Sequence, residues 1–312
     1  MTNAFIFPGQ GSQAVGMGKA LAEASAAARE VFQEVDDALG QHLTALMFDG
    51  PEADLTLTEN AQPAIMAVAI ATLRVLEQEG GVRVADKAAF VAGHSLGEYS
   101  ALCAAGALTL ADTARLLKLR GQAMQAAVPV GVGAMAALLG MDLVPAQAAA
   151  AQAAEGEVCA VANDNAPGQA VLSGHKAAVE RAIELAKAGG AKRAILLPVS
   201  APFHCTLMQP AADAMALALD SAKLRGPFVP LIANVTAGPV SNADDIRRLL
   251  VDQVTGMVRW RESVSAMTGL GVTRFVEFGG KVLGPMIKRI EPDAANVNLL
   301  SMADIEAVLA TL

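Results

Sequence analysis

The sequence predicts an α/β protein with a mostly parallel β-sheet and a smaller inserted domain. Three features lead to this prediction. Short apolar runs recur between longer helical stretches, as expected of strands buried between helices. Two of these runs, ending near residues 7 and 92, lead into glycine-containing turns that precede predicted helices. Between residues 133 and 199, strands and helices follow one another in a different order, which predicts a second sheet.

Strands are expected at the short apolar runs, which are residues 4–7, 88–92, 195–199, 230–234, 274–278 and 297–300. Helices are expected between them, over residues 14–34, 62–79, 97–105, 110–126, 208–221, 243–252 and 284–290. Residues 19–47 as a whole also have a helical pattern. Strands that alternate with helices in this way favour parallel pairing, because each helix carries the chain back to the same edge of the sheet.

The segment from residue 133 to 199 has its own element order. It is expected to form a strand (134–139), a helix (144–154), two strands (158–162 and 170–173), a helix (176–188) and a strand (193–199). This βαββαβ order is typical of a ferredoxin-like unit. We therefore predict a small domain over residues 129–198, inserted into a large domain formed by residues 1–128 and 199–312. A ligand-binding cleft is expected where the two meet.

Composition and charge limit the classes of function. The chain has 312 residues, of which 54% are hydrophobic, so it is expected to bury a large core rather than to be disordered. A formal net charge of −8 repels polyanions, so no nucleic acid and no membrane is expected as a partner. The longest uncharged stretch, residues 121–141, contains proline and several glycines, which does not favour a membrane span.

The cysteines favour a reducing compartment. Cys103, Cys159 and Cys205 are odd in number, widely spaced and without a CxxC pair, so neither a disulfide framework nor a thiolate metal site is predicted. The first residues lack a basic segment followed by an apolar one, which argues against a secretory signal. We therefore expect a cytoplasmic protein.

The stretch "FVAGHSLGEYS" predicts a nucleophile elbow. It places Gly93, Ser95 and Gly97 in the pattern G-x-S-x-G, directly after a predicted strand and directly before a predicted helix. Side chains at the two glycines would collide with neighbouring elements, and the cramped turn lifts the Ser95 hydroxyl above the sheet. The backbone N–H of Leu96 then points toward whatever bonds to Ser95. A capping serine on a glycine-rich turn is the alternative interpretation.

A serine hydroxyl needs a base to remove its proton, and four histidines are available. His42 lies in a polar stretch and is expected at the surface, while His175 lies at a helix start, where capping or exposure explains it. His94 adjoins Ser95 on a sharp turn, where neighbouring side chains diverge, so it is a candidate to line the pocket and not to act as the base. His204 lies on a loop at the expected cleft, which makes it the base by elimination, unless it is an ordinary loop histidine.

No acid completes a Ser–acid–His triad. Serine hydrolases orient the histidine with a carboxylate on a short loop after a core strand. None of the acids between the elbow and His204 occupies such a loop, and these acids are Glu98, Asp112, Asp142, Glu155, Glu157, Asp164, Glu180 and Glu184. A carbonyl oxygen or a side-chain amide is therefore a possible partner for the imidazole.

The opening stretch "FIFPGQGSQA" has three possible interpretations. Gly9, Gly11 and Ala14 fit the dinucleotide pattern G-x-G-x-x-A, but the second strand and the acidic residue that should follow are missing. A P-loop is excluded because no Gly-Lys-Ser/Thr follows. The remaining functional interpretation is that Gln10 and its glycines bring backbone N–H groups to the position of an acyl oxyanion.

Five motifs taken together resemble the malonyl-CoA:acyl carrier protein transacylases of bacterial fatty-acid synthesis. They are "FPGQGSQAVGM", "GHSLGEYSAL", "LKLRGQAM", "PVSAPFHCTLM" and "LVDQVTGMVRW", and they span nearly the whole chain in the family's order. The resemblance implies a hydrolase-like α/β core with a mostly parallel sheet and an inserted ferredoxin-like subdomain. It also implies malonyl-CoA and acyl carrier protein as partners, and no cofactor and no metal.

The resemblance assigns roles by position. Ser95 matches the acylated nucleophile, His204 the general base, and Gln253 the residue whose backbone carbonyl orients that base. Gln10 and Leu96 match the pair whose backbone N–H groups hold the oxyanion.

Four further positions follow from the same resemblance or bear on it. Arg120 matches the arginine that pairs with the free malonyl carboxylate, to which a planar guanidinium is suited. Gln62 lies where the family has a glutamine in the pocket, and Phe203 is similar to the malonyl-selecting form of its loop. His94 remains a candidate pocket residue.

Two other functions stay open from the sequence. A serine esterase or thioesterase would discharge the acyl-serine to water, and a non-catalytic carrier-binding module would form no adduct. Acyl carrier proteins are acidic, so docking on this acidic chain needs a local basic face. The candidate clusters, each equally explained as ordinary solvated charge, are Lys192 with Arg193, Arg259 with Arg261, and Lys281 with Lys288 and Arg289.

Overall fold

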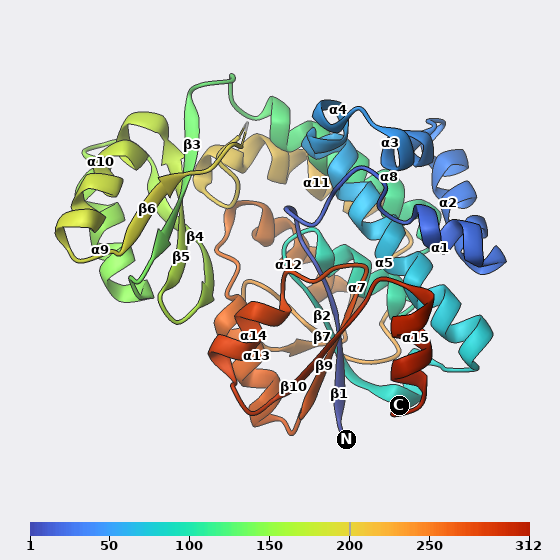
Figure 1. Cartoon of the computed structure of the whole chain (residues 1–312). Helices are drawn as coiled ribbons and strands as arrows, with labels where there is room; N and C mark the ends of the chain where they lie inside the picture. Colours follow the sequence, from blue (N-terminus) through green and yellow to red (C-terminus); the bar gives the residue numbers. More distant parts are fainter. Residues whose placement is uncertain (200) are drawn as a thin grey trace.

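Two separate β-sheets organise the chain in a computed structural model that describes residues 1–199 and 201–312 (Figure 1). The larger sheet has six strands in the order β10-β9-β1-β2-β7-β8. All of its pairs are parallel except β7 with β8, which confirms the predicted mostly parallel sheet. Its strands are β1 (Asn3–Phe7), β2 (Ala88–Gly93), β7 (Leu231–Ile232), β8 (Pro239–Val240), β9 (Arg274–Phe278) and β10 (Ala295–Leu299).

Helices pack on both faces of this sheet. They are α1 (Lys19–Ala24), α2 (Ala26–Leu39), α3 (Leu43–Asp49), α4 (Glu52–Thr56), α5 (Thr58–Gly80), α6 (Val84–Lys87), α7 (Gly97–Ala104), α8 (Leu110–Ala126), α11 (Gln209–Ser221), α12 (Ala243–Thr255), α13 (Trp260–Gly269), α14 (Gly284–Ile290) and α15 (Met302–Leu309). The short turn η1 (Thr206–Met208) precedes α11. Among the helices that the structure describes, none is long and apolar enough to cross a membrane.

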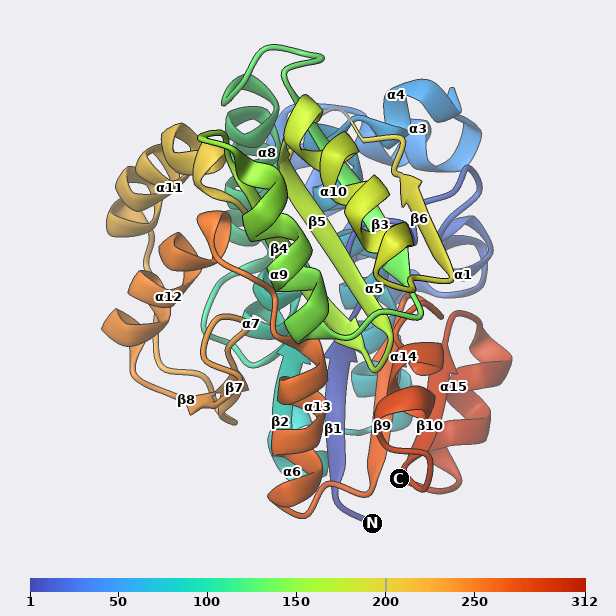
Figure 2. The ribbon, with the colours of Figure 1, turned by 90° about the vertical axis from the view of Figure 1, so that its left-hand side faces the viewer.

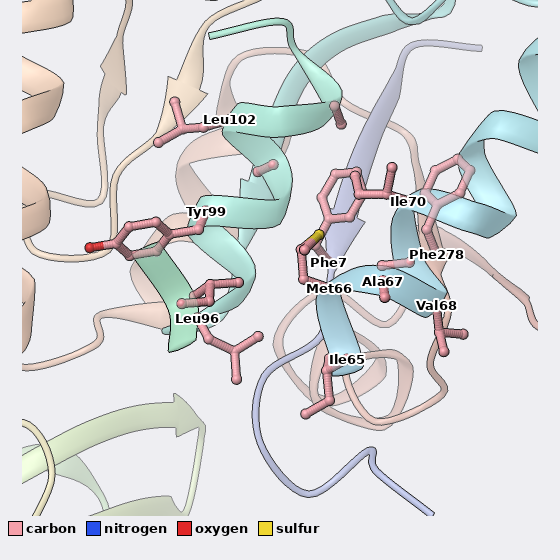
Figure 3. Packing of buried hydrophobic residues seen from close by; sticks show 14 of the residues in the cluster. Phe7, Ile65, Met66, Ala67, Val68, Ile70, Leu96, Tyr99, Leu102 and Phe278 are labelled. Carbon is pink, nitrogen blue, oxygen red and sulfur yellow. The ribbon is translucent and has the colours of Figure 1, made fainter. Parts of the chain in front are cut away.

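Burial on both faces explains why the strands are continuous apolar runs. In β1, Phe5 and Phe7 face one core, while Ala4 and Ile6 face the other. Figure 3 shows the first of these cores, where Phe7 lies between side chains of α5 and α7. The rings of Phe7 and Phe278 stack there with their centroids 5.6 Å apart. These contacts fix the carboxyl ends of β1 and β2, from which the candidate site is built.

The second sheet has four antiparallel strands in the order β4-β5-β3-β6. Its elements are β3 (Gly133–Leu139), α9 (Leu143–Ala154), β4 (Cys159–Ala166), β5 (Gln169–His175), α10 (Lys176–Ala188) and β6 (Arg193–Leu196), so the predicted βαββαβ order is confirmed. Both helices lie over one face of the sheet and share a small apolar core with it (Figure 2). The domain boundaries at residues 129 and 198 stay a prediction.

Main-chain hydrogen bonds join the small sheet to the rest of the chain. The backbone N–H of Asp164 donates to the carbonyl oxygen of Val258 at 3.0 Å, and the N–H of Val258 donates to that of Ala162 at 2.8 Å. These bonds place β4 beside the segment that connects α12 to α13 (Figure 2).

The predicted helix over residues 14–34 is wrong at its start and in its middle. Gly16 and Gly18 have φ angles of 91° and 77°, so helical backbone begins only at Lys19. Ser25 then ends α1 and caps α2, because its side chain accepts a hydrogen bond from the N–H of Ala28. The strands expected over 195–199 and 230–234 are shorter, and the first of them, β6, belongs to the small sheet. Helix α3 lies at the end of the helical pattern over residues 19–47, whereas no predicted helix covers α4, α6, α13 or α15.

Candidate active site

Ser95 lies on a tight turn between β2 and α7, at the carboxyl edge of the parallel sheet (Figure 1). Its φ angle is 53°, a left-handed conformation that a non-glycine residue adopts only where its surroundings enforce it. A Cβ on Gly93 would lie 1.9 Å from the carbonyl carbon of Gly97, and a Cβ on Gly97 would lie 2.3 Å from the carbonyl oxygen of Phe7. The two glycines therefore let α7 approach the strands and hold the turn in this strained form.

The Ser95 hydroxyl is hydrogen-bonded to the imidazole of His204. The distance from Ser95 Oγ to His204 Nε2 is 2.8 Å, and His204 Nδ1 lies 2.8 Å from the backbone oxygen of Gln253. A carbonyl oxygen only accepts, so Nδ1 carries the proton and Nε2 offers its lone pair to the serine hydroxyl. The backbone oxygen of Gln253 thus occupies the place of the missing triad acid.

His204 is held in its neutral form. Burial, together with the neighbouring positive charge of Arg120, lowers the pKa of His204 to about 3. The side chain is 4% exposed, and φ at this residue is 58°. A neutral imidazole is the form that can accept a proton, and His204 is in that form at pH 7.

Arg120 projects from α8 into the same site and is 1% exposed. Its Nη1 donates to Gln62 Oε1 at 2.7 Å, and its Nη2 donates to Gln253 Oε1 at 3.0 Å and to Ser95 Oγ at 3.1 Å. Its guanidinium carbon also lies 5.8 Å from the centre of the Tyr99 ring. Both side-chain amide partners are neutral, so the guanidinium stays available to an anionic group.

Two residues of the site were missed by sequence reasoning. Glu98, on α7, is 1% exposed and accepts hydrogen bonds at Oε2 from Gln253 Nε2 at 2.8 Å and from the backbone N–H of Asn234 at 3.1 Å. Asn234 in turn accepts from the backbone N–H of Ser95 at 2.8 Å and donates to the carbonyl oxygen of Gly93 at 2.7 Å. These bonds link residues more than 130 positions apart in the chain, and no local pattern predicts them.

The pKa of the Glu98 carboxyl lies near neutral pH. Burial raises the pKa of Glu98 to about 7, although hydrogen bonds from Gln253 and Asn234 and the positive charge of Arg120 favour the ionised form. An acid with such a pKa beneath a nucleophile is typical of a functional site.

The opening loop lies against the elbow. A Cβ on Gly9 would lie 2.7 Å from the backbone oxygen of His94, so the loop that carries Gln10 passes close to the residue before Ser95. The Gln10 side chain is exposed, and its Oε1 accepts from the Thr58 hydroxyl at 3.3 Å. Within the described residues, the backbone N–H of Leu96 has no hydrogen-bond acceptor. The oxyanion roles of Gln10 and Leu96 stay predictions.

The other three histidines lie apart from the Ser95 hydroxyl. His94 Nε2 lies 2.8 Å from Asn165 Oδ1 on β4, so its ring points toward the small sheet. His42 is exposed, and His175 precedes α10, where its Nδ1 accepts from the N–H of Val158 at 2.9 Å. Among the residues that the structure describes, no group of three or more His, Cys, Asp or Glu could hold a metal ion.

The chain is similar to acyl transferases over most of its length. The family model of the acyl transferase domain matches residues 4–279. Malonyl CoA-acyl carrier protein transacylase of Escherichia coli K12 is 48% identical over 288 residues, which are 92% of each chain. The protein of the same name from Bacillus subtilis 168 is 44% identical over 311 residues, covering 99% of this chain and 96% of the relative.

Solved structures of proteins with similar names have nearly the same fold as this chain. An acyl-carrier-protein-S-malonyltransferase from Bartonella henselae is 55% identical and superposes with a TM-score of 0.97, covering 99% of each chain. A malonyl-transacylase solved in complex with its type II polyketide synthase acyl carrier protein is 41% identical, with a TM-score of 0.96 and all of both chains covered. The chain belongs to the malonyl CoA-acyl carrier protein transacylases within the acyl transferase family.

Proposed function

We propose that this protein transfers the malonyl group of malonyl-CoA to the phosphopantetheine thiol of acyl carrier protein, for fatty-acid biosynthesis, through a malonyl ester on Ser95. The observation that carries the proposal is the pair of bonds made by one hydroxyl. Ser95 Oγ lies 2.8 Å from a neutral imidazole and accepts a hydrogen bond at 3.1 Å from a buried guanidinium. A base and a carboxylate-binding cation therefore meet at the same nucleophile.

In the first half-reaction, His204 Nε2 removes the proton from Ser95 Oγ, which attacks the thioester carbonyl carbon. The backbone N–H groups of Gln10 and Leu96 hold the resulting oxyanion. The carbon–sulfur bond then breaks, and the proton on Nε2 passes to the departing coenzyme A thiolate. The backbone oxygen of Gln253 accepts from Nδ1 throughout and supports the transient imidazolium.

In the second half-reaction, the thiol of the carrier protein gives its proton to His204 Nε2, and its sulfur attacks the ester carbonyl of malonyl-Ser95. The bond to Ser95 Oγ breaks, and Oγ takes the proton back from His204, so the enzyme is restored. Water must be kept from the ester during this exchange, because hydrolysis would make the enzyme a thioesterase.

Arg120 supplies the malonyl selectivity. Its planar guanidinium suits the free carboxylate of the malonyl group, while the neutral oxygens of Gln62 and Gln253 hold Nη1 and Nη2. An acetyl group would leave this charge without its partner. His94, through Asn165, belongs to the wall of the pocket on the side of the small sheet.

The carrier protein is proposed to dock on a basic face beside the small sheet. Lys192 and Arg289 line one pocket of about 300 Å³, and both are exposed. Within the described part of the chain neither of them forms an ion pair, whereas Arg259 is paired with Glu262 and Arg261 with Asp164. We place the enzyme in the cytoplasm, with the small domain at residues 129–198 and the large domain in the two flanking segments.

The intact mass of the protein after brief mixing with malonyl-CoA tests the proposal, with acetyl-CoA and Ser95→Ala as controls. We expect a malonyl adduct that requires Ser95 and moves to carrier protein bearing a free thiol. An adduct that is lost as fast without the carrier protein as with it would indicate a hydrolase, because water would then be the acceptor. No adduct at all would indicate a non-catalytic module.

A further inference from the structure

Glu98 is a buried acid to which the reaction above gives no role. Its Oε2 accepts two hydrogen bonds, from Gln253 Nε2 and from the backbone N–H of Asn234. Its Oε1 is buried and has no hydrogen-bond partner among the described residues. A buried carboxylate is costly unless it is used, so the bond to Gln253 is the place to look for a function.

The Gln253 amide could be placed in two orientations, and its neighbours allow one. Its Nε2 faces three acceptors, which are Glu98 Oε2 at 2.8 Å, the backbone oxygen of Ser95 at 3.0 Å and Asn234 Oδ1 at 3.3 Å. Its Oε1 faces the Nη2 donor of Arg120. In the reverse orientation the amide oxygen would face these acceptors and the amide nitrogen would face the guanidinium. Glu98 is the one carboxylate among the three acceptors, so it disfavours the reverse orientation most strongly.

This orientation decides how Arg120 is held. Gln253 Oε1 and Gln62 Oε1 are neutral carbonyl oxygens, so they fix the guanidinium without neutralising it. A carboxylate bound directly to Arg120 would compete with the carboxylate of an acyl group. Glu98 lies one side chain further away and is linked to Arg120 through the Gln253 amide, so it acts on the guanidinium through a neutral group.

We propose that Glu98 is a positioning residue for acyl transfer, which fixes the Gln253 amide so that its oxygen holds Arg120 ready for the carboxylate of the acyl group. The inference rests on the proposed function. It makes malonyl selectivity depend on a residue that touches neither the acyl group nor Arg120.

The test compares Glu98→Met, which keeps the size of the side chain but removes the acceptor, with Glu98→Gln, which keeps an acceptor oxygen for both donors. The readout is the ratio of kcat/KM for malonyl-CoA to that for acetyl-CoA, measured on the full chain. We expect Glu98→Met to lower this ratio about tenfold, and Glu98→Gln to stay within about threefold of the wild-type protein, as expected for loss or retention of one charge-assisted hydrogen bond.

Glu277→Met is the matched control. Glu277 is equally buried and accepts from the backbone N–H groups of Val282, Leu283 and Gly284. Its loss should reduce stability but leave the ratio unchanged. If Glu98→Met does not fold, Glu98→Asp takes its place, because the shorter carboxylate cannot reach Gln253 in the same way.

An unchanged ratio in a folded Glu98→Met or Glu98→Asp protein overturns the inference, and so does a tenfold loss in Glu98→Gln. Both results leave the proposed function intact as long as the wild-type protein transfers malonyl groups to the carrier protein. A wild-type protein that fails to do so removes the proposed function itself.

Discussion

At the scale of single residues, burial sets the chemistry of the site. Ser95, His204 and Arg120 meet where water is largely excluded, so each hydrogen bond and each charge acts more strongly than it would at the surface. The site keeps its base neutral and its cation unneutralised at the same time. Burial and the charge of Arg120 keep the base neutral, and the neutral oxygens of two glutamine side chains hold the cation without neutralising it.

Arg120→Ala should lose malonyl selectivity more than it loses acyl transfer. A hydrogen-bonded charge pair lost from the acyl complex costs about 1.5–3 kcal/mol, so the preference for malonyl-CoA over acetyl-CoA should fall roughly 10- to 100-fold. Adduct formation with each thioester, followed by mass, measures this. Arg115→Ala, an exposed arginine on the same helix, is the matched control. An unchanged preference would remove the assigned role of Arg120.

The stability of Glu98→Gln relative to the wild-type protein should depend on pH. The pKa of Glu98 is about 7 in the native protein and ordinarily 4.5, so between these values the native state holds a proton that the unfolded state has released. Its contribution to stability is therefore present at low pH and is lost as the pH rises to 7. The charged or titratable groups that face it are Arg120 from α8 and Tyr99 from α7.

The gap in unfolding free energy between the two proteins should thus shift by about 3 kcal/mol in favour of Glu98→Gln from pH 4.5 to pH 8. Urea denaturation across this range measures it. The opposite contribution of His204, whose lowered pKa makes the native state bind fewer protons, is common to both proteins and cancels. A gap that does not change with pH would show that Glu98 titrates normally.

At the scale of elements, the site depends on how closely α7 approaches β1 and β2. Alanine at position 97 would place its Cβ 2.3 Å from the carbonyl oxygen of Phe7, which is backbone and cannot move aside as a side chain would. Gly97→Ala should therefore cost about 3 kcal/mol of stability and slow adduct formation on Ser95. Gly269→Ala, on α13, where no atom lies within 4 Å of the added Cβ, should leave both unchanged.

Urea denaturation and adduct mass, measured on both variants, check this prediction. Wild-type stability together with wild-type adduct formation in Gly97→Ala would mean that α7 can move away from the strands without consequence. Wild-type stability with slow adduct formation would mean that the turn, and not the fold, depends on the close approach.

At the scale of the whole molecule, two sheets of different architecture meet above the parallel sheet's carboxyl edge. Ser95 comes from the large sheet's edge, whereas Asn165, which bonds to His94, comes from the small sheet. Lys192 and Arg289 approach one pocket from these two parts of the chain. This arrangement suits an acidic carrier protein that must contact both parts while its thiol reaches the ester.

Charge reversal at Lys192 and Arg289 should weaken carrier-protein docking. We expect Lys192→Glu with Arg289→Glu to raise the KM for carrier protein roughly tenfold, with a smaller effect at high salt, and to leave the rate of adduct formation from malonyl-CoA unchanged. Lys223→Glu, another exposed lysine, is the matched control. Equal effects of all charge reversals would place docking elsewhere.

The sequence alone predicted strands β1, β2, β9 and β10, the elbow and the residue types that carry the chemistry, because these depend on local apolar runs, close-approach glycines and motif spacing, but it left out helices α4, α6, α13 and α15. It also determined the small domain's βαββαβ order. It could not determine the breaks at Gly18 and Ser25 in the first helical stretch, since apolar spacing there continues across them.

How distant residues combine depends on the packing of the folded chain. The hydrogen bonds of Gln253 to His204, Arg120 and Glu98 join three separate segments, and no local pattern carries such information. Burial likewise decided the pKa values of His204 and Glu98, because desolvation depends on what the fold packs around a group and not on its neighbours in the chain. The residue types were therefore set by the sequence, and their protonation and orientation by the fold.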